Sequence, residues 1–182
     1  METERILLRR WRESDAGDLF SYARDPEVGP IAGWPPHRDI EESLSVIRNV
    51  LNGPEAYAIC LKGDGRAIGA IEMKLRGHSD LVEGDDECEL GFWLGKPFWG
   101  RGLMPEAVRE MLRHAFEDCG MSKVWCACYD GNEKSKRVQE KCGFRYRWTS
   151  RDVEVPLLHE RRTGHVNCLT KEEWQQGIIR NG

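Results

Sequence analysis

The sequence predicts an α/β sandwich built on one mixed sheet. Short apolar runs bounded by glycine, proline or polar residues are typical of strands, and longer runs with apolar residues at helical spacing are typical of helices. Along the chain these runs follow the order β-α-α-β-β-β-α-β-α-β-β. No internal repeat and no linker interrupts them, so residues 1–182 are expected to form a single domain.

The N-terminal part of the chain predicts a strand and two helices. Apolar and polar residues alternate enough in residues 5–12 to indicate a strand, and Ser14 or Asp15 is placed to cap the helix that follows. Residues 25–38 hold four prolines and two glycines, and they predict an ordered loop that buries Trp34. A second helix follows this loop.

The other elements follow from the same two patterns. The clearest helix begins near Met104, carries one continuous apolar stripe and ends at Gly120. Two more helices are expected over residues 132–141 and from Thr170 onward. Further strands are expected at residues 57–61, 67–73, 87–94, 124–129, 144–153 and 164–169.

Charge and apolar content argue against two classes of partner. The formal net charge is −4, and acidic residues gather in residues 80–87. Such a surface repels a phosphate backbone, so no nucleic acid partner is expected. No apolar run has the length of a membrane-spanning helix, and the N-terminus has no apolar signal region. We therefore expect a cytoplasmic protein that does not enter a membrane.

The seven cysteines do not predict a metal site. Their count is odd, and they form no CxxC pair. Cys126 and Cys128 would point the same way from one strand, but zinc sites usually combine two close pairs, or one pair with histidines at fixed spacing. The five histidines show no such spacing either. We expect reduced, mostly buried thiols and no metal.

A phosphate-binding turn is predicted between the strand at residues 87–94 and the helix that follows it. Gly100 and Gly102 lie in this turn, and glycines there let backbone N–H groups turn inward around an anion. The N-terminus of the helix adds unpaired N–H groups and the positive end of its dipole. A second signature, NEKSKRVQEKCGF at residues 132–144, follows the next strand.

Together these two segments resemble the coenzyme A-binding core of the GNAT superfamily of N-acetyltransferases, in its RimJ/RimL-like branch. The predicted element order is also that of the GNAT fold, so the resemblance covers nearly the whole chain. It implies a mixed, mostly antiparallel sheet of about seven strands, flanked by helices and splayed at strands 4 and 5. It also implies direct transfer of an acetyl group from acetyl-CoA, the co-substrate, to an amine substrate. Many relatives dimerise, and a homodimer stays open.

The resemblance assigns roles in binding acetyl-CoA. The backbone of Phe92, Trp93 and Leu94 matches the part of the fourth strand that pairs with the pantetheine arm and holds the thioester oxygen. Asn132 matches the residue that holds the same arm, and an N-cap is its alternative role. The pyrophosphate loop corresponds to Phe98, Trp99, Gly100, Arg101, Gly102 and Leu103.

Two positions depart from the family's pattern. Pro97 stands where many relatives carry Gln or Arg, so one phosphate contact is missing. Gln139 stands where many relatives carry a tyrosine that protonates the departing thiolate. Ser135 is expected to donate a hydrogen bond to that sulfur instead. Because a free thiol has a pKa near ~8.5, a thiolate leaving group needs only modest help near neutral pH.

A general base is needed because the acceptor amine arrives largely protonated. An α-amine has a pKa around 8 and a lysine side chain about 10.4, so deprotonation at pH 7 costs about 1 kcal/mol for the first and over ~4 kcal/mol for the second. Glu89 is the first candidate base, since the family often carries a glutamate at this place. Glu87 lies on the same face of the strand, and Glu72 on the adjacent strand is the second candidate.

A catalytically silent protein stays open as a second function. A GNAT-fold protein that only senses coenzyme A, or assembles around it, would tolerate Pro97 and Gln139, whereas Glu89 and Ser135 favour catalysis. A mononucleotide loop is a third interpretation, but the turn lacks the Gly-Lys-(Ser/Thr) of a P-loop and the third glycine of a dinucleotide fingerprint. The expected acceptor is a protein or peptide N-terminal amine or a related small amine.

Overall fold

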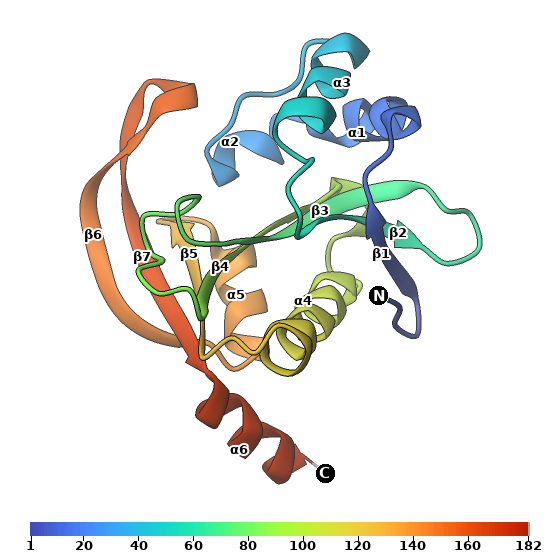
Figure 1. Ribbon diagram of the computed structural model, residues 1–182. Coiled ribbons are helices and arrows are strands. Elements are labelled where there is room, and N and C mark those ends of the chain that lie inside the picture. Colours follow the sequence, from blue (N-terminus) through green and yellow to red (C-terminus); the bar gives the residue numbers. More distant parts are fainter. Residues whose placement is uncertain (182) are drawn as a thin grey trace.

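One seven-stranded sheet forms the centre of the protein. The computed structural model describes residues 1–181, with side-chain detail for residues 1–177. The strand order is β1-β2-β3-β4-β5-β7-β6, and every neighbouring pair is antiparallel except β4 and β5 (Figure 1). The strands are β1 (Ile6–Arg10), β2 (Ala56–Leu61), β3 (Ala67–Lys74), β4 (Glu87–Leu94), β5 (Lys123–Tyr129), β6 (Arg145–Val155) and β7 (Glu160–Thr170).

Helices cover both faces of this sheet. In Figure 1 the group α1, α2 and α3 lies above the sheet and the pair α4 and α5 lies below it. The helices are α1 (Ala16–Ala23), α2 (Gly29–Ala32), α3 (Ile40–Asn49), α4 (Leu103–Arg113), α5 (Glu133–Lys141) and α6 (Lys171–Asn181). Among the helices within residues 1–181, none is both long enough and apolar enough to span a bilayer.

The predicted α/β architecture is confirmed, with three local differences. The loop at residues 25–38 contains the short helix α2, which ends at Gly33 with a φ of 98°. The long helix changes after Arg113 into a π-helical turn, η3 (His114–Asp118). The last two strands are eleven residues each and meet in a tight turn at His159. Strand β6 ends two residues beyond the strand expected at residues 144–153, and β7 begins four residues before the strand expected at residues 164–169.

The parallel contact between β4 and β5 is short. Only three residue pairs join the two strands, Glu87–Lys123, Cys88–Val124 and Glu89–Trp125. Beyond Glu89 each strand keeps its outer neighbour, β3 or β7, but the two no longer pair with each other. The expected splay between the fourth and fifth strands is therefore confirmed, and it leaves a gap between two rigid half-sheets.

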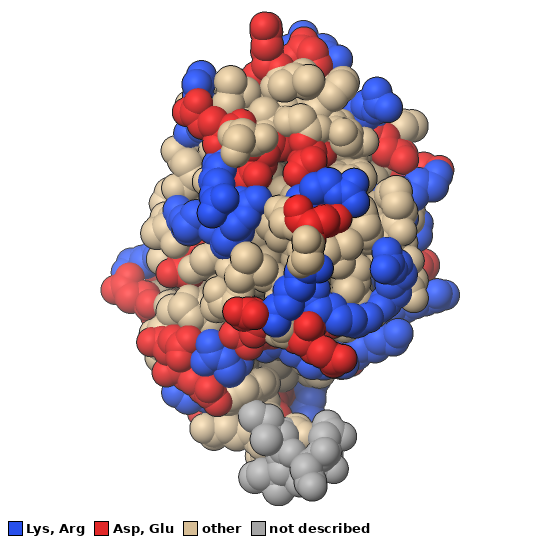
Figure 2. Space-filling view, turned by 90° about the vertical axis from the view of Figure 1, so that its right-hand side faces the viewer, with Lys and Arg blue, Asp and Glu red and all other residues tan. Residues whose placement is uncertain are grey.

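The main core lies between the sheet and α4. The apolar stripe predicted on this helix is fully buried against β1, β3 and β4, and it includes Ala107, Val108, Met111, Leu112, Ala115 and Phe116. Six of the seven cysteines are buried as free thiols, and Cys119 is exposed. Acidic and basic side chains are interspersed over the face that carries the β1 edge (Figure 2), so the net charge of −4 is not concentrated there.

A buried ion pair fixes the end of β1 against the start of α1. Both oxygens of Asp15 accept hydrogen bonds from the Arg9 guanidinium at 2.7 Å, and Oδ2 also accepts from the Arg12 N–H at 2.8 Å. Burial alone raises the pKa of Asp15, but these hydrogen bonds outweigh it and hold the pKa below its ordinary value of 3.8. The pair holds the chain at its first turn.

We expect Asp15→Asn to lower the unfolding free energy by about 2–4 kcal/mol near pH 7, because it leaves Arg9 without its charged partner. The pKa of Asp15 is depressed in the folded state, so its contribution is present above the unfolded value and is lost as the pH falls through the folded value. Urea unfolding at pH 7 and below pH 4 measures both effects. Asp64→Asn, at an exposed turn, is the control and should change stability little; equal losses would contradict a special role for Asp15.

Candidate functional site

The glycine turn has the conformation of an anion-binding loop. Gly100 and Gly102 have φ angles of 72° and 75°, which L side chains rarely adopt. A Cβ at Gly100 would meet no atom within 4 Å, so the backbone conformation rather than space requires glycine there. Gly102 is the N-cap of α4 and has no side chain to accept from the first-turn N–H groups. These donors are left for an anion.

Arg5 braces this loop from β1, which the sequence did not predict. Its Nη1 donates to the Arg101 carbonyl at 2.9 Å, and its Nε donates to Glu106 Oε2 at 2.7 Å. Glu106 lies in the first turn of α4 and also accepts a hydrogen bond from Thr3. The contacts join residues about one hundred positions apart, and nothing in the local pattern around Arg5 signals them.

The side chains of the loop mostly support it from beneath. Phe98 and Leu103 are buried in the core, so only their backbone can contact a ligand. The Trp99 indole N–H donates to the Leu94 carbonyl at 2.7 Å, and Lys134 Nζ lies 3.9 Å from the centre of the Trp99 ring. Trp99 therefore packs under the loop and also holds a cation beside it. Arg101 is exposed.

The gap between β4 and β5 starts after Glu89 and opens toward the end of β4 that leads into this loop. Phe92, Trp93 and Leu94 follow the last β4–β5 pair, so their backbone lies along the open side of β4. Phe92 and Leu94 pack into the core beneath the sheet. Trp93 lies on the opposite face, where it packs with residues of the α1–α3 group. The splay thus exposes strand backbone next to the uncapped end of α4.

Asn132 and Ser135 lie together at the start of α5. Asn132 Oδ1 accepts from the Ser135 N–H at 3.2 Å, so the N-cap role of Asn132 is present. Its Nδ2 lies 3.4 Å from the Ile31 carbonyl. The Asn132 amide therefore links α5 to the loop that holds α2.

Gln139 stands where many relatives carry a tyrosine that acts as an acid, and here it has a defined structural role. It is 1% exposed, and its Nε2 donates to Ser135 Oγ at 3.1 Å. Asn167 on β7 donates to Gln139 Oε1 at 2.7 Å, which fixes the orientation of the amide. Ser135 Oγ thereby accepts one hydrogen bond and keeps its own proton to donate elsewhere. The sequence did not single out Asn167, whose partner lies 28 residues away.

The opposite face of the sheet gathers two glutamates. Glu72 on β3 lies opposite Gly91 on β4, and Lys74 lies opposite Glu89. Lys74 Nζ is 3.7 Å from Glu89 Oε1, so Glu89 has a cationic partner. Within residues 1–177, Glu72 has no hydrogen bond and no ion pair. Burial raises the pKa of the Glu72 carboxyl, and the nearby charge of Glu89 adds a smaller effect in the same direction. The charge of Lys74 acts in the opposite direction but does not outweigh them.

Glu87 differs from both of these carboxylates. It is nearly buried, forms an ion pair with Lys123 at 2.8 Å and accepts a hydrogen bond from the Trp125 indole at 2.9 Å. Burial raises the pKa of Glu87, but the two hydrogen bonds prevail and lower it. Glu87 thus ties β4 to β5 at the closed end of the gap.

The loop around α2 reaches both arms of the gap. Trp34 packs edge-on against Trp93 of β4, with ring centroids 5.7 Å apart. A Cβ at Gly33 would come within 2.9 Å of the Tyr129 ring on β5, so only glycine allows this approach. Arg162 of β7 donates to the Pro30 carbonyl at 2.6 Å. The loop with Gly33 and Trp34 therefore spans the gap between β4 and β5.

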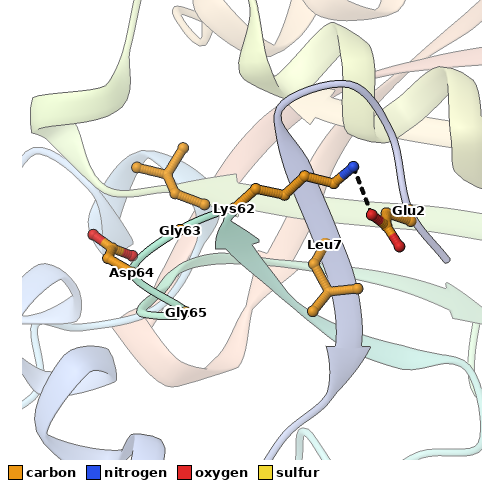
Figure 3. A pocket seen from close by; sticks show the side chains of 7 residues that line it. Glu2, Leu7, Lys62, Gly63, Asp64 and Gly65 are labelled. Carbon is orange, nitrogen blue, oxygen red and sulfur yellow. Dashed lines mark ion pairs between the residues drawn. The ribbon is translucent and has the colours of Figure 1, made fainter.

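Two surface hollows are not lined by residues of the glycine turn. One of about 440 Å³ lies where the β2–β3 turn meets the N-terminus, and Figure 3 shows its Lys62–Glu2 ion pair and the turn glycines. It contains no catalytic pair of side chains. Another of about 410 Å³ lies against α5 and β7, beside Gln139 and Asn167.

Comparison with known proteins identifies the kind of site. A sequence model described as the acetyltransferase (GNAT) domain matches residues 5–145, which hold the glycine turn and the start of α5. A Bacillus subtilis protein, named provisionally as the ribosomal N-acetyltransferase YdaF, is 32% identical over 126 residues, covering 69% of this chain and 63% of that protein. The matched stretch thus spans just under two thirds of that relative.

A second relative and two solved structures are also similar to this chain. The Aspergillus fumigatus FsC-acetyl coenzyme A-N(2)-transacetylase is 34% identical over 164 residues, covering 82% of this chain and 67% of that protein. A GNAT-family acetyltransferase from Bacillus anthracis has a TM-score of 0.82 at 20% identity, covering 94% and 98% of the two chains. The microcin C7 self-immunity acetyltransferase MccE, solved with acetyl-CoA and AMP, has a TM-score of 0.73 at 19% identity, covering 92% and 93%. The two structures show the same fold.

We expect Gly102→Glu to weaken coenzyme A binding at least ~100-fold, or about 2.7 kcal/mol, because a carboxylate would enter the ring of N–H donors. Isothermal titration calorimetry with coenzyme A measures this. Gly65→Glu is the matched control, since Gly65 has a similar φ of 70° and an open surrounding in the β2–β3 turn. Equal affinity in the Gly102 variant and the wild type would place the ligand elsewhere.

Proposed function

We propose that this chain, which belongs to the acetyltransferase (GNAT) family, is an acetyl-CoA-dependent N-acetyltransferase whose acceptor is the primary α-amine of a protein or peptide N-terminus or a related small amine. The observation that carries the proposal is the unpaired, half-buried carboxylate of Glu72 opposite Gly91. One weak base suits an α-amine, whose deprotonation at pH 7 costs about 1 kcal/mol, better than a lysine side chain at over ~4 kcal/mol.

The names of two relatives support this class of acceptor. One is named for ribosomal N-acetylation, and the other for transfer to an N(2) position. Both names describe an amine nitrogen as the acceptor. An amine that reaches Glu72 would pass the wall formed by Trp34 and Trp93, whose rings are 5.7 Å apart. Aromatic walls tolerate a cation at their faces, which suits an ammonium before it is deprotonated.

The residues that would hold acetyl-CoA are those of the gap and the glycine turn. Gly100 and Gly102 adopt left-handed conformations, and the N-cap of α4 offers no side-chain acceptor, which fits a pyrophosphate. The open edge of β4 at residues 92–94 fits the amides of a pantetheine arm. Bound there, the group would supply the acetyl thioester. A strand N–H would donate to the thioester oxygen as charge develops.

Two glutamates compete for the role of general base, and their surroundings favour Glu72. Glu89 is engaged in an ion pair, since its Oε1 lies 3.7 Å from Lys74 Nζ. Within residues 1–177 the Glu72 carboxylate forms no ion pair, and its pKa is raised by burial, which the charge of Lys74 does not outweigh. Glu72 would therefore take the proton from the ammonium, and Glu89 would hold Lys74 aside. The proposal reverses the order of the two candidate bases expected from the sequence, which placed Glu89 before Glu72.

Ser135 would assist the leaving sulfur. As the N–C bond forms and the C–S bond breaks, the departing thiolate needs a donor. Ser135 Oγ accepts from Gln139, so its own O–H is free to donate to that sulfur. The substitution at position 139 therefore replaces a tyrosine acid by a residue that orients the serine. This arrangement argues against the alternative of a silent coenzyme A-binding protein.

We expect Glu72→Gln to lower kcat/KM by about 10²–10⁴-fold at pH 7, since general-base catalysis contributes that much. The loss should shrink at high pH, where the amine is already deprotonated. Glu89→Gln is the isosteric comparison on the same face and should cost less than ~10-fold. Release of free thiol from acetyl-CoA with N-terminal peptides, followed over pH, measures both. The reverse order of losses would assign the base to Glu89.

We expect Ser135→Ala to lower kcat about 10–100-fold while the affinity for coenzyme A changes little, because the hydrogen bond forms only as charge develops on sulfur. The loss should be smaller with an acetyl thioester of a more acidic thiol. Ser21→Ala, which removes an exposed hydroxyl on α1, is the control. If kcat is unchanged in the Ser135 variant, Ser135 does not assist the thiolate.

A further inference from the structure

Three metal-ligating side chains meet at the end of α4 that is remote from the glycine turn. Glu55 lies just before β2, and His114 and Cys119 lie at the two ends of the π-helical turn η3. Their ligand atoms all lie within 4.8 Å of one another. The side chains of Glu55 and His114 are 20% and 16% exposed, and Cys119 is at the surface. No part of the proposed acetyl transfer uses this cluster.

The π-helical turn creates the cluster. In an α-helix, residues five positions apart point in different directions, because one turn takes 3.6 residues. Here the Cys119 N–H donates to the His114 carbonyl at 2.9 Å, which closes an i to i+5 turn. The wider turn brings Cys119 Sγ to 3.4 Å from His114 Nε2. Such π-turns are rare and are often found at functional sites.

The separations match those of ligands on one zinc ion. Zinc bonds of about 2.0 Å to nitrogen or oxygen and about 2.3 Å to sulfur, at tetrahedral angles, place N and O ligands about 3.3 Å apart and N and S ligands about 3.5 Å apart. The observed distances are 3.0 Å from Glu55 Oε2 to His114 Nε2 and 3.4 Å from Cys119 Sγ to His114 Nε2. One ion can therefore join His114 Nε2 to either partner with little movement, and the third pair of ligand atoms, from Glu55 and Cys119, lies within 4.8 Å.

Neighbouring groups orient the three ligands. Asp118 Oδ2 lies 2.9 Å from His114 Nδ1, and with the proton on Nδ1 the lone pair of Nε2 faces Glu55 and Cys119. The Tyr57 hydroxyl donates to Glu55 Oε2 at 2.9 Å. Arg113 holds Asp118 with two hydrogen bonds at 2.9 and 2.8 Å. A carboxylate behind a histidine ligand is the usual support of a zinc site.

We propose that Glu55, His114 and Cys119 bind one Zn²⁺ ion, with water in the fourth position. Imidazole and thiolate together select zinc over magnesium or calcium, which prefer oxygen ligands. Glutamate and thiolate together neutralise the ion. Binding displaces the thiol proton.

The site would clamp two segments that are distant in the sequence. Glu55 belongs to the segment between α3 and β2, which passes Gly53 beside Glu72 Oε1. His114 is twelve positions from Gly102, or about 18 Å along the helix at 1.5 Å per residue, so the ion would not contact the glycine turn. Its role is thus to fix the start of β2 to the end of α4.

The test uses the full-length protein, stripped with a chelator and titrated with Zn²⁺ or Co²⁺. We expect one ion per chain, an increase in melting temperature with Zn²⁺, and with Co²⁺ the thiolate-to-cobalt charge-transfer band of a cysteine ligand. Iodoacetamide labelling of the folded protein gives an independent measurement, because Cys119 is exposed and the other six cysteines are buried. Zn²⁺ should protect Cys119 from labelling.

Single variants distinguish a specific zinc site from a general attraction of the ion to acidic side chains. Cys119→Ser, His114→Ala and Glu55→Gln should each weaken Zn²⁺ binding at least ~100-fold, and Asp118→Asn about 10–100-fold. Cys119→Ser should also abolish the charge-transfer band. Glu117→Gln is the matched control, because Glu117 is an exposed carboxylate of the same turn that contacts only Arg113 at 3.5 Å. His159→Asn is the matched control for the histidine, and both controls should bind like the wild type.

Two results would overturn the proposal. One is a wild type that binds neither ion at one per chain below millimolar concentration. The other is a Cys119→Ser variant that retains wild-type affinity and the cobalt spectrum, since the exposed position tolerates serine without unfolding the chain. Protection of Cys119 together with loss of affinity in Glu55→Gln but not in Glu117→Gln would establish the site.

Discussion

The site depends on one constraint in the sheet, which is that β4 and β5 pair over only three residues. A sheet edge inside a folded domain leaves N–H and C=O groups without partners, and such groups must find hydrogen bonds elsewhere. Here the Trp99 indole satisfies the Leu94 carbonyl, and the loop with Trp34 and Gly33 covers the other face. The remaining strand backbone at residues 92–94 lies beside the uncapped start of α4. An extended ligand with amides and a pyrophosphate fits both sets of unpaired donors and acceptors.

The residues that lie across from each polar side chain at the gap decide whether that side chain forms a hydrogen bond or an ion pair. Glu87 and Glu89 are two residues apart on one strand, yet Glu87 is held by Lys123 and Trp125 and Glu89 by Lys74. Glu72, one strand away, lies opposite Gly91, which offers no side chain, and remains without a hydrogen bond or ion pair within residues 1–177. Burial raises the pKa of this carboxyl, and the opposing charge of Lys74 does not outweigh it. The role of Ser135 also depends on its neighbours. Asn167 fixes the orientation of the Gln139 amide, and Gln139 donates to Ser135 Oγ, so the serine hydroxyl keeps its proton to donate.

Helix α4 connects two regions of opposite electrostatic character. At its start, Gly102 leaves N–H donors free for an anion, and Arg5 and Glu106 hold that end to β1. After its last turn, η3 gathers an imidazole, a thiolate precursor and two carboxylates, which suit a cation. The helix dipole favours this distribution, because it is positive at the N-terminus and negative at the C-terminus. Val108, Met111 and Leu112 lie in the core between the two ends of α4, so the distance between the glycine turn and η3 is fixed.

The sequence by itself determined the architecture and the position of the glycine turn before α4. Apolar periodicity fixes the strands and the stripe of α4, and left-handed glycines beside a helix start are a local property that short-range patterns reveal. It also named Asn132, Ser135 and both glutamates. Only the tertiary structure decided what these residues do, because their partners come from distant segments: Arg5 and Glu106 are 101 positions apart, and Glu55 and His114 are 59 apart. The π-turn that places Cys119 beside His114 has no sequence pattern, since it depends on how the end of α4 packs. Hydrogen bonds, burial and charge act through space, so they assign chemistry only once the chain has folded.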